Sequence, residues 1–209
     1  MYGIVTSVQT DFSQTFQIEG LDVRGRLVRL GPELDKIIDA HGYPAAVSEM
    51  LAETLTLAAT LASALKYDGL FSLQVQSDGP ISLLVADVTS AGAMRGYARY
   101  DADRVATASA GPGAKVPRLL GSGHLAFTVD QGQDMERYQG IAALDGANLA
   151  ECAHHYFHNS EQLETAIFLA ADVKDGTAKA GALMVQRMPQ TIPEHHVVDA
   201  EEAEDGWRR

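Results

Sequence analysis

Cysteine, basic side chains and tryptophan are all scarce in this sequence. Its 209 residues include one cysteine, Cys152, and one tryptophan, Trp207. A single cysteine excludes an intrachain disulfide and a zinc site built from several thiolates, and it favours a cytoplasmic location. Lys and Arg number 16 against 28 Asp and Glu, which gives a formal net charge of −12. The charge therefore argues against nucleic acid and anionic membrane surfaces as partners, because both need basic side chains on the protein.

The sequence also lacks a targeting segment and a strongly apolar run. Residues 1–20 contain no basic stretch followed by an apolar one, so we predict no signal peptide. Residues 47–65 are the longest mostly apolar stretch, yet Ser, Thr and Glu side chains interrupt them repeatedly. We therefore expect this stretch to be too polar to span a membrane. Because 46% of all residues are apolar, the chain can instead build a sizeable core.

Apolar residues at helical spacing are clearest in residues 44–65, which predicts a long central helix. A shorter helix is expected to start at Gly31-Pro32 and to end at Gly42. Segments in which apolar and polar side chains alternate predict strands. These segments are residues 21–27, 71–75, 81–85, 94–100, 125–129, 137–144, 165–171 and 180–187.

The connections between these strands decide the fold class. Residues 77–80 (Ser-Asp-Gly-Pro) and Asp175-Gly176 are typical hairpin turns, and few strands are separated by helices. We therefore expect an α+β fold, with antiparallel sheets built from hairpins packed around the long helix and further helices outside. Residues 108–123 are rich in Gly, Pro and Ser, and we expect them to form an exposed loop.

The composition changes after Pro189. The tail contains an acidic run at residues 199–205 and the lone Trp207. We expect residues 1–189 to form one folding domain and residues 190–209 to be a solvated acidic linker, in which the chain looks truncated.

A search for catalytic motifs finds no candidate. The glycine-rich stretch that ends at Lys115 lacks the spacing of a phosphate-binding loop and the Ser or Thr that follows its lysine. No Gly-x-Ser-x-Gly motif and no distinctive pair of carboxylates is present. We therefore predict no catalytic residue, and a binding protein is favoured over an enzyme.

A helix is expected over residues 148–159. Asn148 is the predicted N-cap, and Glu151 stands three residues later, as in a capping box. Cys152 lies on the apolar side of this helix and is predicted to be a buried packing residue, not a reactive thiol. The apolar side consists of Leu149, Cys152, Ala153, Tyr156 and Phe157.

The other face of this helix carries Glu151, His154, His155 and His158. Two interpretations remain open. His154 and His158 are four residues apart and could bind one metal ion, with an oxygen from Glu151. Alternatively, this histidine face and the nearby Glu161 lie at a homodimer contact, which needs fewer additional ligands. Such a contact is expected to weaken as the pH falls towards ~5.5 and histidines gain charge.

Several motifs, in this order along the chain, resemble one family: the redox-regulated bacterial heat-shock chaperone of about 33 kDa. The resemblance covers roughly residues 20–190 and rests on the order of the motifs, since each alone is short. The motifs are Val-Arg-Gly-Arg-Leu at 23–27, Leu-Lys-Tyr-Asp-Gly at 65–69, Gln-Ser-Asp-Gly-Pro at 76–80, Met-Arg-Gly-Tyr-Ala-Arg at 94–99, Arg-Tyr-Gln-Gly at 137–140, Leu-Ala-Glu-Cys at 149–152, Ser-Glu-Gln-Leu at 160–163 and Ala-Gly-Ala-Leu-Met-Val-Gln-Arg-Met-Pro at 180–189.

The resemblance implies an ATP-independent chaperone that binds unfolding proteins during oxidative and heat stress. It also implies an active homodimer, and a C-terminal region whose four cysteines hold zinc until oxidation releases it. No cysteine follows Pro189 here, and Cys152 does not match a position of that zinc site. We therefore expect no cofactor in this chain, zinc only in a full-length protein, and client binding that does not respond to oxidants. The alternatives are a metal-binding module on the histidine face and an enzyme whose site one sequence does not reveal.

Overall fold

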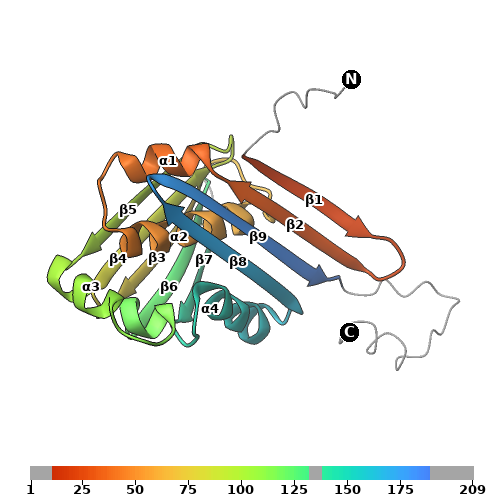
Figure 1. Ribbon diagram of the computed structural model, residues 1–209. Coiled ribbons are helices and arrows are strands. Elements are labelled where there is room, and N and C mark those ends of the chain that lie inside the picture. The colour runs from red at the N-terminus through yellow and green to blue at the C-terminus, as the bar shows by residue number, and fades with distance from the viewer. Residues whose placement is uncertain (1–10, 132–137, 189–209) are drawn as a thin grey trace, which may run out of the picture.

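Two antiparallel sheets form the framework of the protein (Figure 1). The computed structural model describes residues 11–131 and 138–188. The four-stranded sheet has the order β1-β2-β9-β8, and the five-stranded sheet has the order β5-β4-β3-β6-β7. The strands are β1 (Phe12–Ile18), β2 (Val23–Leu30), β3 (Leu70–Ser77), β4 (Ile81–Thr89), β5 (Met94–Tyr100), β6 (Gly123–Asp130), β7 (Tyr138–Ala143), β8 (Thr165–Lys174) and β9 (Thr177–Arg187).

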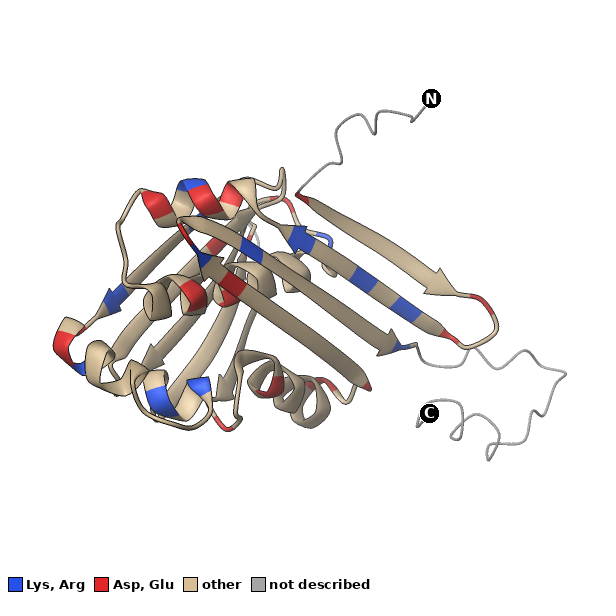
Figure 2. Ribbon diagram, in the orientation of Figure 1, with Lys and Arg blue, Asp and Glu red and all other residues tan. Residues whose placement is uncertain are grey.

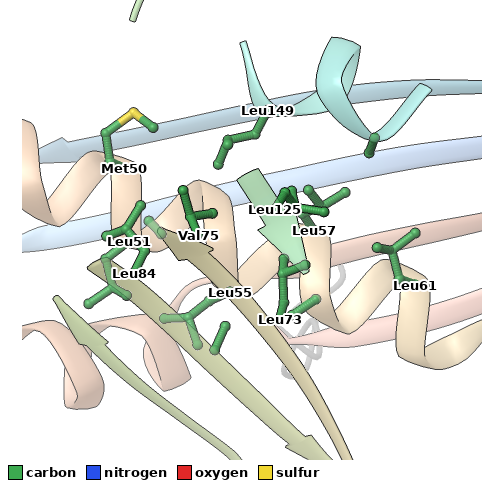
Figure 3. Close-up of a cluster of buried hydrophobic side chains, with 14 of the residues drawn as sticks. Met50, Leu51, Leu55, Leu57, Leu61, Leu73, Val75, Leu84, Leu125 and Leu149 are labelled. Atoms are coloured by element: carbon green, nitrogen blue, oxygen red, sulfur yellow. The ribbon is translucent and has the colours of Figure 1, made fainter. Parts of the chain in front are cut away.

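Helix α2 (Ala45–Ser63) lies between the two sheets and contacts strands of both (Figure 1). Its leucines point toward Leu73, Leu84 and Leu125 of the five-stranded sheet (Figure 3). The hydroxyls of its buried threonines donate to carbonyls four residues earlier, so their burial leaves no unpaired donor. By length and apolar composition α2 could cross a membrane, contrary to our expectation, but 78% of its most apolar 18-residue stretch is buried inside this fold.

Three further helices lie outside the sheets: α1 (Pro32–Asp39), α3 (Ala102–Ser109) and α4 (Leu149–Tyr156). The predicted capping box of α4 is present, since the Asn148 side chain accepts a hydrogen bond from the Glu151 N–H. A π-helical turn, η2 (Phe157–Glu161), extends α4. The α+β fold predicted from the sequence is confirmed, with hairpins that pack around one central helix.

The glycine-rich stretch 108–123 differs from the exposed loop that we expected. It contains a second π-helical turn, η1 (Val116–Leu120), in which Val116, Leu119 and Leu120 are buried. Arg118 holds the stretch together by donating hydrogen bonds to the carbonyls of residues 108, 109 and 111. The apolar side chains of η1 lie among many Gly and Pro residues, so composition alone hides them.

In residues 21–27, whose alternation predicts a strand, the apolar side chains are Leu21, Val23 and Leu27, and only Val23 is buried. Leu21 lies in the turn before β2 and is exposed, and Leu27 is 41% exposed on the side of β2 that faces away from α2. Further along β2, Val28 and Leu30 belong to the main core. The strand extends three residues beyond the predicted segment, to Leu30. The even-numbered residues of β2 pair with the buried, even-numbered residues of β9, so they lie on the side of the sheet that faces α2.

Candidate functional site

The outer side of the four-stranded sheet carries an apolar surface. Strand register places Leu27 opposite Leu183 and Leu183 opposite Phe168, so these three side chains lie on one face. Phe168 is 63% exposed, whereas Ala182, the next residue along β9 from Leu183, is buried against α2. We call this surface the outer apolar face and define it by Phe16, Ile18, Leu27, Phe168, Leu183 and Val185.

A hollow of about 570 Å³ lies where the outer apolar face meets α4. Phe168 and Val185 of the outer apolar face line it together with His154 and His158. The imidazole rings of the two histidines are stacked, with their centroids 6.4 Å apart. Nδ1 of His154 lies 2.5 Å from the carbonyl oxygen of Thr165, at the start of the edge strand β8. The structure therefore places the predicted histidine face next to an exposed strand edge.

The two predicted acidic members of this site have other partners. Both carboxylate oxygens of Glu151 accept hydrogen bonds at the start of α4, from the Ala147 N–H at 2.7 Å and the Asn148 amide at 2.8 Å. Glu161 accepts hydrogen bonds from the hydroxyls of Tyr138 and Tyr156. Glu151 thus stabilises the helix start, and Glu161 is fixed to the rings of β7 and α4.

The remaining predicted members, His154, His155 and His158, are exposed on one side of α4 and η2. The ring of His155 lies 6.2 Å from that of His154. Within residues 11–131 and 138–188, no group of three or more His, Cys, Asp or Glu side chains is placed to hold a metal ion. The metal-binding alternative therefore lacks a third protein ligand in the described part of the chain.

Cys152 is buried in the core, as its place on the apolar side of the helix predicts. Burial, with smaller contributions from Glu151 and Asp145, raises the pKa of its thiol to about 11. The thiol is therefore protonated at neutral pH, and it lacks the electropositive, accessible surroundings that reactive cysteines need.

Lys115, the lysine of the glycine-rich stretch, bonds to two carboxylates of α2. Its Nζ lies 2.5 Å from Glu49 and 2.6 Å from Glu53. Burial lowers the pKa of Lys115, but its bonds to Glu49 and Glu53 outweigh burial and raise it. The charge of Lys115 is already paired with two carboxylates, which would repel a phosphate group at this position. The stretch therefore does not form a phosphate-binding loop.

Reasoning from the sequence missed the outer apolar face. Leu183 and Val185 alternate with the buried Ala182 and Met184, so β9 is apolar on both sides. The same holds for residues 166–171 of β8. A strand that is apolar on both sides is the available signal, but it is equally typical of a strand buried between two layers.

Comparison with known proteins places these features in a family. The family model described as Hsp33 protein matches residues 11–205. The chain is 45% identical over 188 residues to a 33 kDa chaperonin of Caulobacter vibrioides and 41% identical over 197 residues to one of Ectopseudomonas mendocina. These matches cover 87% and 94% of this chain, and in both cases 62% of the relative's length.

A solved structure agrees at the level of the fold. The crystal structure of the 33 kDa chaperonin from Thermotoga maritima superposes with a TM-score of 0.74 at 22% sequence identity. The match covers 89% of this chain and 64% of that one. The family model, which spans nearly all of the sequence, decides the assignment: the chain belongs to the Hsp33 family.

Proposed function

We propose that this chain is a chaperone domain that binds unfolding proteins without ATP, on its outer apolar face, in the cytoplasm during heat and oxidative stress. One observation carries the proposal: large apolar side chains of four strands lie together on an exposed sheet face. Contiguous exposed apolar surface is uncommon on soluble proteins and marks interaction sites. The relatives named 33 kDa chaperonins support the same function.

Independence from ATP and the absence of catalysis are parts of this proposal. The bonds of Lys115 to Glu49 and Glu53 support independence from ATP, because the glycine-rich stretch has no cation available for a phosphate. The raised thiol pKa of Cys152 supports a binding role over a catalytic one. This chain contains one cysteine, which is buried, so we also propose that these residues form no zinc site built from several thiolates.

We further propose that two copies associate through the histidine face. His154 and His158 are exposed beside the edge strand β8, whose outer backbone groups have no neighbouring strand in the described structure. Edge strands with exposed apolar side chains tend to pair with another chain. In a two-fold contact here, each histidine face meets the same face of the partner.

Substitution of Phe168 tests where clients bind. We expect Phe168→Asp to reduce suppression of client aggregation several-fold, because it places a charge on the most exposed side chain of the outer apolar face, next to Leu183. The matched control is Ile141→Asp, since Ile141 is also exposed (58% against 63%) but lies on the other sheet. Light scattering of a heated client enzyme measures both variants. Equal activity of F168D and wild type would place client binding elsewhere.

A further inference from the structure

A second apolar pocket lies on the inner side of the four-stranded sheet, near the end of α2. Its volume is about 320 Å³. The ring of Phe127 lies 4.7 Å from that of Tyr156 in an edge-to-face arrangement and 6.2 Å from that of Phe71 in a stacked one. Tyr138 and Phe157 add two more rings to the wall. The pocket thus offers several ring edges and faces to an aromatic group.

Gly140 allows this aromatic wall to form. A Cβ atom at this position of β7 would lie 2.2 Å from Cζ of Phe127 and 2.6 Å from the hydroxyl oxygen of Tyr156. Both distances are far below van der Waals contact, so any larger residue would push the rings apart. The two rings therefore pack directly against Gly140, and the wall of the pocket is formed without a bound ligand.

Polar groups from two different elements line the same pocket. Tyr138 and Tyr156 donate to one carboxylate oxygen of Glu161, and the other oxygen has no partner among the described residues. Arg24 of β2 donates through Nε to the side chain of Gln186 at 3.2 Å. Its two Nη atoms have no partner within the described ranges. The pocket therefore offers one free acceptor and free donors beside its aromatic wall.

We propose that this pocket binds one aromatic side chain of an unfolded polypeptide and the backbone next to it. The ring packs against Phe127, Tyr138 and Phe157, an adjoining peptide N–H donates to Glu161, and an adjoining carbonyl accepts from Arg24. A volume of about 320 Å³ is at the small end of ligand pockets and suits one side chain. The proposal rests on the proposed chaperone function and identifies the kind of client residue that the protein selects.

Peptide binding to the full chain tests this pocket. The probes are fluorescein-labelled nine-residue Gly-Ser peptides with one central Phe, Leu or Ser, measured by fluorescence anisotropy. Ala64→Met fills the pocket with a flexible apolar side chain. Ala59→Met is its control, because Ala59 lies in the last turns of α2, five residues before the C-cap Ala64, but lines a different pocket. Glu161→Gln replaces the free acceptor with an N–H donor. Circular dichroism establishes that each variant is folded.

Wild type is expected to bind the Phe peptide more tightly than the Leu peptide, and both more tightly than the Ser peptide. Ala64→Met and Glu161→Gln should each weaken binding of the Phe peptide about tenfold, while Ala59→Met leaves it unchanged. Equal binding of the Phe and Ser peptides, or equal effects of A64M and A59M, overturns the pocket. Wild type that suppresses aggregation without preferring the Phe peptide contradicts this pocket alone. Wild type that prefers the Phe peptide without suppressing aggregation contradicts the chaperone function alone.

Discussion

Glu53 is a carboxylate in the core, and Lys115 is its counter-ion. The Glu53 side chain is only 6% exposed, and burial raises its pKa although the bond to Lys115 acts in the opposite direction. An acid whose folded-state pKa is raised stabilises the fold fully below its unfolded pKa, about 4.3. That contribution is lost as the pH rises through the folded-state pKa. Removal of Lys115 will therefore harm the protein more at high pH than at low pH.

We expect Lys115→Met to lower the free energy of unfolding by about 3 kcal/mol at pH 8, because it leaves a buried carboxylate without a partner. The loss should shrink towards pH 5, as Glu53 becomes protonated. Urea denaturation at the two pH values measures both. Lys174→Met is the control, since Lys174 is exposed at the end of β8. A loss that is independent of pH would show that Glu53 is not the group responsible.

At the scale of single elements, α4 and η2 combine a core-facing side with the histidine face. We expect His154→Ala/His158→Ala to shift a homodimer towards monomer, because the substitutions remove two exposed rings that each copy presents across a two-fold contact. Sedimentation velocity over a range of protein concentrations measures the effect. A monomer under all conditions, or a dimer that the double substitution does not alter, contradicts the proposed contact.

The same elements show how far sequence patterns reach. The start of α4, the length of α2 and the hairpin turns were predicted, because caps, helical spacing and turn residues act over a few neighbouring positions. β1 and α3 were not predicted. Phe12 and Phe16 lie four residues apart, and both are only half-buried. In α3 a single residue, Val105, is buried, so neither element carries a strong apolar pattern.

At the scale of the whole molecule, the candidate binding surfaces depend on contacts between distant parts of the chain. Leu27, Leu183 and Phe168 become neighbours only through strand register. Arg24 and Glu161 line one pocket only because the two sheets close around α2. A single sequence does not show these contacts, which explains why the fold and family were predicted while the outer apolar face and the aromatic pocket were not.

Charge is also distributed unevenly over the molecule. Figure 2 shows basic residues along β2 and acidic residues near the helices and turns. On β2, Arg26 donates to the carbonyl of Ser63 at the end of α2, at 3.0 Å. Burial, with a smaller contribution from Arg24, lowers the pKa of Arg26. The Arg26 bond therefore joins β2 to the end of the central helix, on the side of the sheet opposite the outer apolar face.

Light scattering of a heated client enzyme, with the chain kept in dithiothreitol or treated with hydrogen peroxide, tests the central claim most directly. The only cysteine is buried with a thiol pKa of about 11, so oxidant has no reactive thiol to act on at neutral pH. We predict strong suppression of aggregation without ATP, equal in both conditions. No suppression in either condition would contradict client binding by this chain. Suppression that appears only after oxidation, and that persists in Cys152→Ser, would contradict the absence of a redox switch.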